Sequence, residues 1–189
     1  LITLLAEWGT LRLADVLAPA IELADGYPIE RETADAIERH KERLKEWPYS
    51  REVMLPHLGE AREGPAPGEI FRQPDLADTL RKLVEAEQQA RAKGATRSAA
   101  ILAAFDRFYK GDIAQEFDRF FKANGGVLTA ADLAAYTPKW TEPLHTTYRG
   151  HDVYSNPATS RGGFEVLMGA NLIEPVDLKA AGPGTPAAL

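Results

Sequence analysis

The apolar residues of this sequence recur at helical spacing in one segment after another as far as about residue 136. Apolar side chains three and four positions apart share one face of an α-helix, so each such segment predicts an amphipathic helix. Short runs that favour β-strands come only after Pro143. The pattern therefore predicts an α+β protein that is mainly helical, with a short β region near its C-terminal end.

Glycine and proline set the expected helix boundaries, because both residues commonly end a helix and proline also begins one. Thr10 is predicted to cap the first helix, Pro19 to kink or break it, and Gly26 to end it. Pro48 is predicted to end the second helix, and the proline- and glycine-rich residues 48–68 to be irregular. The helices are expected over residues 13–24, 30–47, 74–93, 98–110, 112–123, 129–136 and 164–172.

Three local patterns add detail. Residues 85–93 are so polar that this end of a helix is expected to project into solvent. Thr129 and Asp132 resemble a capping box at the start of a short helix, which follows the helix-ending glycines of residues 124–126. The β-prone runs at residues 144–148 and 152–155 predict a hairpin or a pair of sheet strands.

Composition excludes several classes of function. The formal charge of −6 argues against nucleic-acid binding, which needs clustered cations. The absence of cysteine removes disulfides, thiolate metal sites, iron–sulfur clusters and cysteine nucleophiles. No run approaches the ~18 apolar residues that cross a bilayer, so no membrane partner is expected. No metal and no cofactor is predicted.

Candidate chemistry is sparse. His40 lies on an apolar stripe and is interpreted as a hydrogen-bonded core or boundary histidine rather than a catalytic one. His57, near Glu60 and Glu63, is interpreted as solvated rather than metal-binding, because no second His or Cys lies at ligand spacing. The aromatic stripe of residues 113–121 is interpreted as core rather than as a cofactor site.

The small residues at positions 160–163 form a strand-to-helix turn whose free N–H groups offer an anion site. We favour the simpler interpretation that the glycines let the helix pack tightly. The sequence contains no phosphate loop, no dinucleotide-binding glycine motif, no zinc-protease motif and no nucleophile elbow, and its histidines suggest no triad.

Ordered motifs over nearly the whole chain resemble the gamma-glutamyltransferase (gamma-glutamyltranspeptidase) family. They are GT at residues 9–10, VLAPAIELA at 16–24, GYPI at 26–29, QPDLADTL at 73–80, FYKGDIA at 108–114, NGGVLT at 124–129, DLAAY at 132–136, YRG at 148–150, VY at 153–154 and PATSRGG at 157–163.

The resemblance implies part of an N-terminal-nucleophile hydrolase with α, β, β and α layers. In this family a precursor cuts itself into a large and a small subunit. The new N-terminal threonine of the small subunit attacks gamma-glutamyl amides such as glutathione, and its own amine serves as the base. Water or an amino acid then takes the acyl group. The implied partners are the small-molecule substrate and the small subunit, and the family suggests a periplasmic or extracellular location.

The match covers an interior part of the large subunit, so no catalytic residue is expected in this chain. Arg149 and Arg161 are therefore assigned no role. We expect a helical subdomain over residues 1–142, and the start of a core-sheet hairpin with its following helix over 143–189. The chain does not begin with Met, and both of its ends read as cut from a longer protein.

Two departures from the family pattern leave other functions open. Residues 85–104 form a longer helical excursion, and residues 156–161 replace a turn that is usually rich in proline and serine. An acylase that acts on another amide is one alternative. The other is a non-catalytic helical module that presents residues 85–104 to a protein partner.

Overall fold

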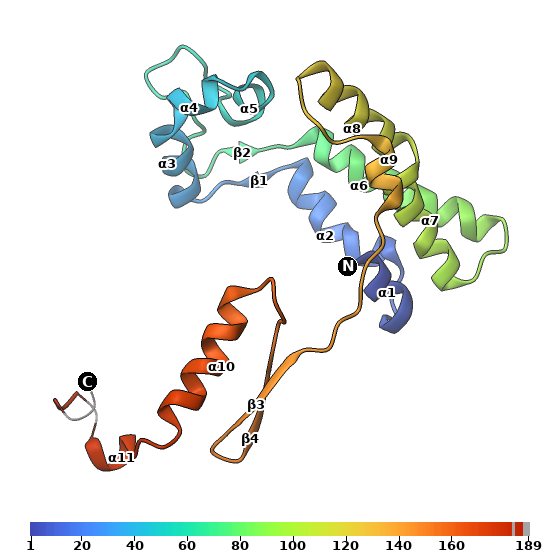
Figure 1. Cartoon of the computed structure of the whole chain (residues 1–189). Coiled ribbons are helices and arrows are strands. Elements are labelled where there is room, and N and C mark those ends of the chain that lie inside the picture. The colour runs from blue at the N-terminus through green and yellow to red at the C-terminus, as the bar shows by residue number, and fades with distance from the viewer. Residues whose placement is uncertain (183, 187–189) are drawn as a thin grey trace. The chain divides into compact units, whose positions relative to one another are not determined.

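The computed structural model describes residues 1–182 and 184–186, so the end of the predicted segment 143–189 lies partly outside the described residues. The chain divides into two compact units, Leu1–Tyr136 and Thr137–Leu189, which are described separately. The first is helical apart from a two-stranded ribbon, and the second joins a hairpin to a helix (Figure 1). In the described part of the chain, no helix has the length and apolar character needed to span a membrane.

Most helices of the first unit form a bundle around one core (Figure 1). They are α1 (Ile2–Trp8), α2 (Leu13–Asp25), α6 (Pro74–Ala92), α7 (Arg97–Lys110), α8 (Asp112–Ala123) and α9 (Ala130–Ala135). The helices pack because each turns an apolar stripe inward. The buried core consists of Ala6, Leu13, Leu83, Ile101, Ala104 and Ile113.

A second core lies within the segment that connects α2 to α6. Its elements are β1 (Tyr27–Pro28), α3 (Arg31–Arg39), α4 (Lys41–Lys45), α5 (Pro48–Met54) and β2 (Ile70–Phe71). The two strands pair antiparallel, with Tyr27 opposite Phe71 and Pro28 opposite Ile70. The buried side chains are Ile29, Ala34, Ile37, Leu55 and Phe71.

The predicted start of the first helix is wrong. Arg12, not Thr10, is the N-cap of α2. The Arg12 N–H donates to the Asp15 carboxylate, and the Arg12 guanidinium pairs with that carboxylate at 2.9 Å. The break expected at Pro19 is also absent: α2 continues through Pro19 to Asp25. Its other hydrogen bonds and its packing on α6 hold the helix together despite the missing N–H and the clash of the proline ring with the preceding turn. Gly26 ends the helix as predicted, with a φ of 151°.

The predicted helix over residues 30–47 is two helices, α3 and α4, separated at His40. His40 has a φ of −102° and a ψ of 10°, which interrupts the regular helix. Pro48 does not lead into an irregular segment as expected. It occupies the first turn of α5, where the missing N–H of proline costs no intrahelical bond.

The expectation that residues 85–93 project into solvent holds for most of them but not for Glu87, which is only 1% exposed. Its carboxylate oxygens accept the N–H groups of Leu13 at 3.0 Å and Ala14 at 3.1 Å, at the start of α2. These are among the N–H groups that a helix start leaves without a partner. The α6–α7 pair is thus tied into the bundle, and it does not form the free arm that a binding module would present.

The predicted end of α8 and the predicted capping box of α9 are confirmed. Gly125 adopts a φ of 73° just after α8. Thr129 caps α9 by accepting the Asp132 N–H at 3.2 Å, and Asp132 accepts the Thr129 N–H at 2.9 Å. The aromatic stripe of α8 is core only in part, since Ile113 is buried whereas Phe117 is 38% exposed.

The second unit contains β3 (Leu144–Tyr148), β4 (His151–Ser155), α10 (Arg161–Ile173) and α11 (Leu178–Ala181). The strands form the predicted antiparallel hairpin, in which Leu144 lies opposite Ser155 and Tyr148 opposite His151. Arg149 and Gly150 make the turn with φ values of 50° and 80°. Two successive residues at positive φ match the twist of a tight hairpin.

Candidate functional site

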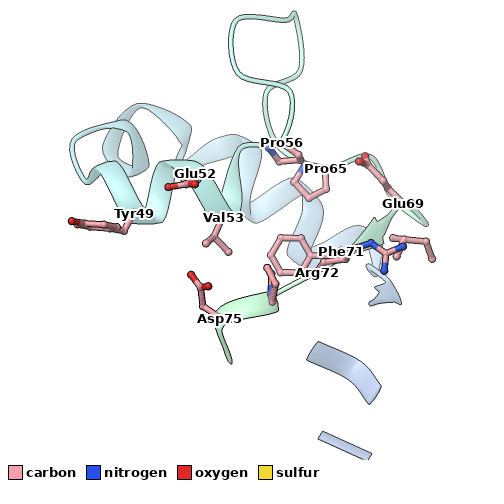
Figure 2. Close-up of a pocket in the computed structure, with 11 residues that line it drawn as sticks. Tyr49, Glu52, Val53, Pro56, Pro65, Glu69, Phe71, Arg72 and Asp75 are labelled. Atoms are coloured by element: carbon pink, nitrogen blue, oxygen red, sulfur yellow. The ribbon is translucent and has the colours of Figure 1, made fainter. Parts of the chain in front are cut away.

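A pocket of about 450 Å³ opens in the first unit between α5, β2 and the start of α6. Figure 2 shows Glu52 and Val53 on α5, with Asp75 facing them from the start of α6. Strand β2 leads almost directly into α6, so the pocket has α5 on one side and the β2–α6 junction on the other. The lining residues are Tyr49, Glu52, Val53, Pro56, Pro65, Glu69, Ile70, Phe71, Arg72, Pro74 and Asp75.

Two of the charged groups in this pocket already have structural partners. Both carboxylate oxygens of Glu69 lie 2.9 Å from His57 Nε2, and one accepts the Ala66 N–H at 2.7 Å. The Arg72 guanidinium donates to the Asp25 carbonyl at 2.6 Å. The hydrogen bond to Glu69 raises the pKa of His57, and the bond from His57 lowers the pKa of Glu69. This pair therefore fixes the loop before β2.

The His57–Glu69 pair predicts a pH-dependent stability. The pKa of His57 is raised above its ordinary 6.5, so its contribution is full below about pH 6.5 and is lost as pH rises through the raised pKa. The pKa of Glu69 is lowered from 4.5, so its contribution is lost as pH falls below about 4.5. Because the two side chains are 33% and 31% exposed, we expect the pair to contribute only about 0.5 kcal/mol to the free energy of unfolding.

The measurement compares the urea midpoint at pH 5.5 and pH 8.5 for the protein and for His57→Gln. We expect the variant to lose stability at the lower pH only. His40→Gln is the matched control, because His40 is exposed. An equal loss at both pH values in His57→Gln would show that the ion pair contributes nothing.

The pocket offers little for covalent chemistry. Its lining residues include no serine, threonine, cysteine or lysine. Carboxylates and one phenol can bind a polar molecule or exchange a proton, but they provide no activated hydroxyl or amine of the kind used in acyl transfer.

The structure does not bring the sequence candidates together at this pocket. His40 is exposed at the junction of α3 and α4, so its interpretation as a core or boundary residue is wrong. His57 is bonded to Glu69 and is more than a solvated loop residue. In the described residues, no three His, Cys, Asp or Glu side chains converge as a metal site would require.

The structure confirms the interpretation that the glycines at residues 160–163 let the start of α10 pack tightly. Ser160 caps α10, and its hydroxyl accepts the Gly163 N–H at 3.5 Å. A Cβ on Gly163 would lie 2.5 Å from the Asn156 carbonyl oxygen and 2.7 Å from Ser155 Oγ. The glycine is needed because the helix start lies directly against the end of β4.

Sequence reasoning missed one polar cluster, on the exposed face of the hairpin. His145 Nε2 lies 2.8 Å from Asp152 Oδ1, and the His145 ring stacks on Tyr154 at 4.6 Å. The hairpin register was the available signal. His145 lies opposite Tyr154, and Asp152 lies two residues before Tyr154 on β4, so all three side chains share one face. Across the described residues no Ser or Thr hydroxyl is hydrogen-bonded to a histidine, so the cluster is not a triad.

Both arginines that were left without a role have structural partners. The Arg149 N–H donates to the Glu174 carboxylate at 2.9 Å, and its guanidinium donates to the Val176 carbonyl at 3.2 Å. Arg161 pairs with Glu165 at 2.6 Å along α10. These contacts explain both side chains without a substrate.

Comparison with known proteins decides the family. The family model described as Gamma-glutamyltranspeptidase matches residues 1–189. The chain belongs to the gamma-glutamyltranspeptidase family. The glutathione hydrolase-like YwrD proenzyme of Bacillus subtilis (strain 168) is 36% identical over 92% of this chain and 29% of that protein. The glutathione hydrolase proenzyme of Escherichia coli (strain K12) is 31% identical over 96% of this chain and 28% of that protein. The chain thus spans less than a third of these curated relatives.

Solved structures share the fold of this chain. The gamma-glutamyltranspeptidase of Helicobacter pylori is 29% identical, with a TM-score of 0.80 over 98% of this chain and 48% of that one. A cephalosporin acylase from Bacillus halodurans is 34% identical, with a TM-score of 0.65 over 82% of this chain and 26% of that one. The predicted fold, a mainly helical α+β fragment of an N-terminal-nucleophile hydrolase, is confirmed. That this chain holds no catalytic residue stays a prediction.

Proposed function

We propose that this chain is part of an enzyme that cleaves gamma-glutamyl amides such as glutathione and transfers the gamma-glutamyl group to water or to an amino acid. The family match over residues 1–189 is the observation that carries this proposal. It is supported by relatives named glutathione hydrolase proenzyme. The role of the chain is structural: residues 1–142 form a helical subdomain, and residues 143–189 begin the core sheet.

In the proposed reaction, a threonine outside this chain becomes the first residue of the small subunit when the precursor cuts itself. Its hydroxyl attacks the gamma-glutamyl carbonyl, and its own amine takes the proton. The amine of the substrate leaves, and water or an amino acid then attacks the acyl-enzyme. This chemistry needs no histidine base, which agrees with the structural partners of His57 and His145. The proposed location is the periplasm or the cell exterior.

An acylase that acts on another amide is the second candidate. The observation in its favour is the 34% identity to the Bacillus halodurans cephalosporin acylase, together with 31% identity to the acylase ACY 1 proenzyme of Pseudomonas sp. (strain SE83). The relatives on both sides include proteins named as proenzymes, and the two candidates differ in the acyl group that the active site would accept.

The experiment measures chromophore release from a gamma-glutamyl anilide and hydrolysis of a cephalosporin amide by the full-length protein. We expect the protein to appear as two subunits and to prefer the gamma-glutamyl anilide. Replacement of the nucleophilic threonine by alanine should abolish both self-cleavage and turnover.

Residues 1–189 expressed alone are the second control, and we expect them to be inactive. Turnover by residues 1–189 alone would contradict the assignment of the nucleophile to the remainder of the protein. A preference for the cephalosporin amide would favour the acylase.

A further inference from the structure

The pocket between α5, β2 and the start of α6 contains two carboxylates that no described group neutralises. Four of its lining residues are charged, and two of these are already engaged: Glu69 is paired with a histidine, and Arg72 donates to a backbone carbonyl. In the described residues, the carboxylates of Glu52 and Asp75 accept no hydrogen bond and form no ion pair. The pocket therefore contains negative charge without a partner.

The two unpaired carboxylates lie on opposite sides of the pocket. Figure 2 shows Glu52 on α5 and Asp75 at the start of α6, with the ring of Tyr49 on the same side as Glu52. Two like charges that face each other across a small space repel. A cation bound between them would replace this repulsion by two attractions, so the charges of the pocket are complementary to a cation.

The walls of the pocket are mostly apolar, which favours an organic cation over a hydrated metal ion. Tyr49 and Ile70 are 59% and 47% exposed, so their side chains are open to a ligand, and the face of an aromatic ring attracts a cation. A volume of about 450 Å³ is typical of small-molecule sites. A divalent metal ion takes six or more oxygen ligands, and no three metal-ligating side chains converge in the described residues. The other apolar lining residues are Val53, Pro56, Pro65, Phe71 and Pro74.

We propose that this pocket binds a small organic cation, a primary amine attached to an aromatic or alkyl body. The ammonium group lies between Glu52 and Asp75, because its three donors can serve two carboxylates at once. The apolar body packs against the ring of Tyr49 and the apolar walls. The bound amine thus joins α5 to the start of α6. This site does not depend on the proposed function, since it requires no acyl transfer.

The first test compares a charged ligand with a neutral one of the same shape. Calorimetric titration of the full-length protein in phosphate buffer at neutral pH uses phenethylamine as the probe and 2-phenylethanol as its neutral counterpart. We expect phenethylamine to bind saturably and 2-phenylethanol to bind at least tenfold more weakly, because the hydroxyl brings no charge to the two carboxylates. No saturable binding of phenethylamine, or equal affinity for the two compounds, would overturn the proposal.

The second test removes the charges one at a time. We expect Glu52→Gln and Asp75→Asn each to weaken phenethylamine binding at least tenfold, with urea midpoints that show both variants to be folded. Glu46→Gln is the matched control, because Glu46 is an exposed carboxylate without a printed partner that does not line the pocket. Equal affinity of all three variants for phenethylamine would overturn the proposal.

The third test locates the bound amine, since an amine can also enter an active site that transfers acyl groups. Hydrogen exchange of the full-length protein is compared with and without phenethylamine. We expect slower exchange in residues 49–56 and 69–76, which contain the pocket lining on both sides. Protection confined to other parts of the protein would overturn the proposal. Displacement of phenethylamine by MgCl₂ at constant ionic strength would also overturn it, in favour of a metal site.

Discussion

Replacing Glu87 by alanine should lower the free energy of unfolding by about 2–4 kcal/mol, the largest loss expected for a single polar side chain of the first unit. The carboxylate is 1% exposed and accepts two backbone N–H groups at the start of α2. Its removal leaves both donors without a partner, and the buried Leu13 N–H has no access to water. It also removes a negative group from the positive end of the helix dipole.

Chemical denaturation of the full-length protein measures this effect. Glu87→Gln should lose about 1–2 kcal/mol, because the amide keeps one acceptor but turns an N–H₂ group toward the second helix donor. Glu22→Gln on the exposed surface of α2 should change stability by less than about 0.5 kcal/mol. A Glu87→Ala protein as stable as the Glu22→Gln control would show that α2 does not depend on this contact.

Substitution of Gly163 by alanine should destabilise the second unit by about 2 kcal/mol. The added Cβ would lie 2.5 Å from the Asn156 carbonyl oxygen, closer than real carbon and oxygen atoms approach. This atom belongs to the backbone and cannot rotate away, so the start of α10 would have to move off β4. Hydrogen exchange of the β4 amides, together with thermal unfolding of the full-length protein, measures the change.

The neighbouring glycine is the matched control. A Cβ on Gly162 would meet no atom within 4 Å, and its φ lies outside the left-handed region. Gly162→Ala should therefore raise stability by up to about 1 kcal/mol, because alanine loses less backbone entropy in a helix. If both variants were equally tolerated, α10 and β4 would not be in close contact.

The boundaries that sequence reasoning predicted well depend on neighbouring residues. Thr129 and Asp132 cap each other over three positions, and Gly125 ends α8 because of its own backbone conformation. Both partners of such an interaction lie close together in the sequence, so a short stretch is enough to predict it. The capping of α2 by Glu87 joins residues 74 positions apart, so residues 85–93 looked only like a solvated helix end.

Pro48 illustrates a different limit. Proline ends one helix and begins the next by the same property, its missing N–H, so the residue alone does not distinguish the two cases. The pocket was also beyond prediction, because its lining includes β2, a strand of only two residues. Strands this short show no alternation of apolar and polar residues. The absence of a catalytic residue, by contrast, was inferred from the family resemblance.

The pairing of Tyr27 with Phe71 has a consequence for the stability of the helical bundle. Because the ribbon brings both ends of residues 29–69 to one point, that segment is attached to the bundle like a loop with a core of its own. Lengthening, shortening or exchanging it leaves the α2–α6 contact in place, since the entropy of closing a loop grows only slowly with its length. A change in the length of residues 29–69 should therefore cost the helical bundle little stability.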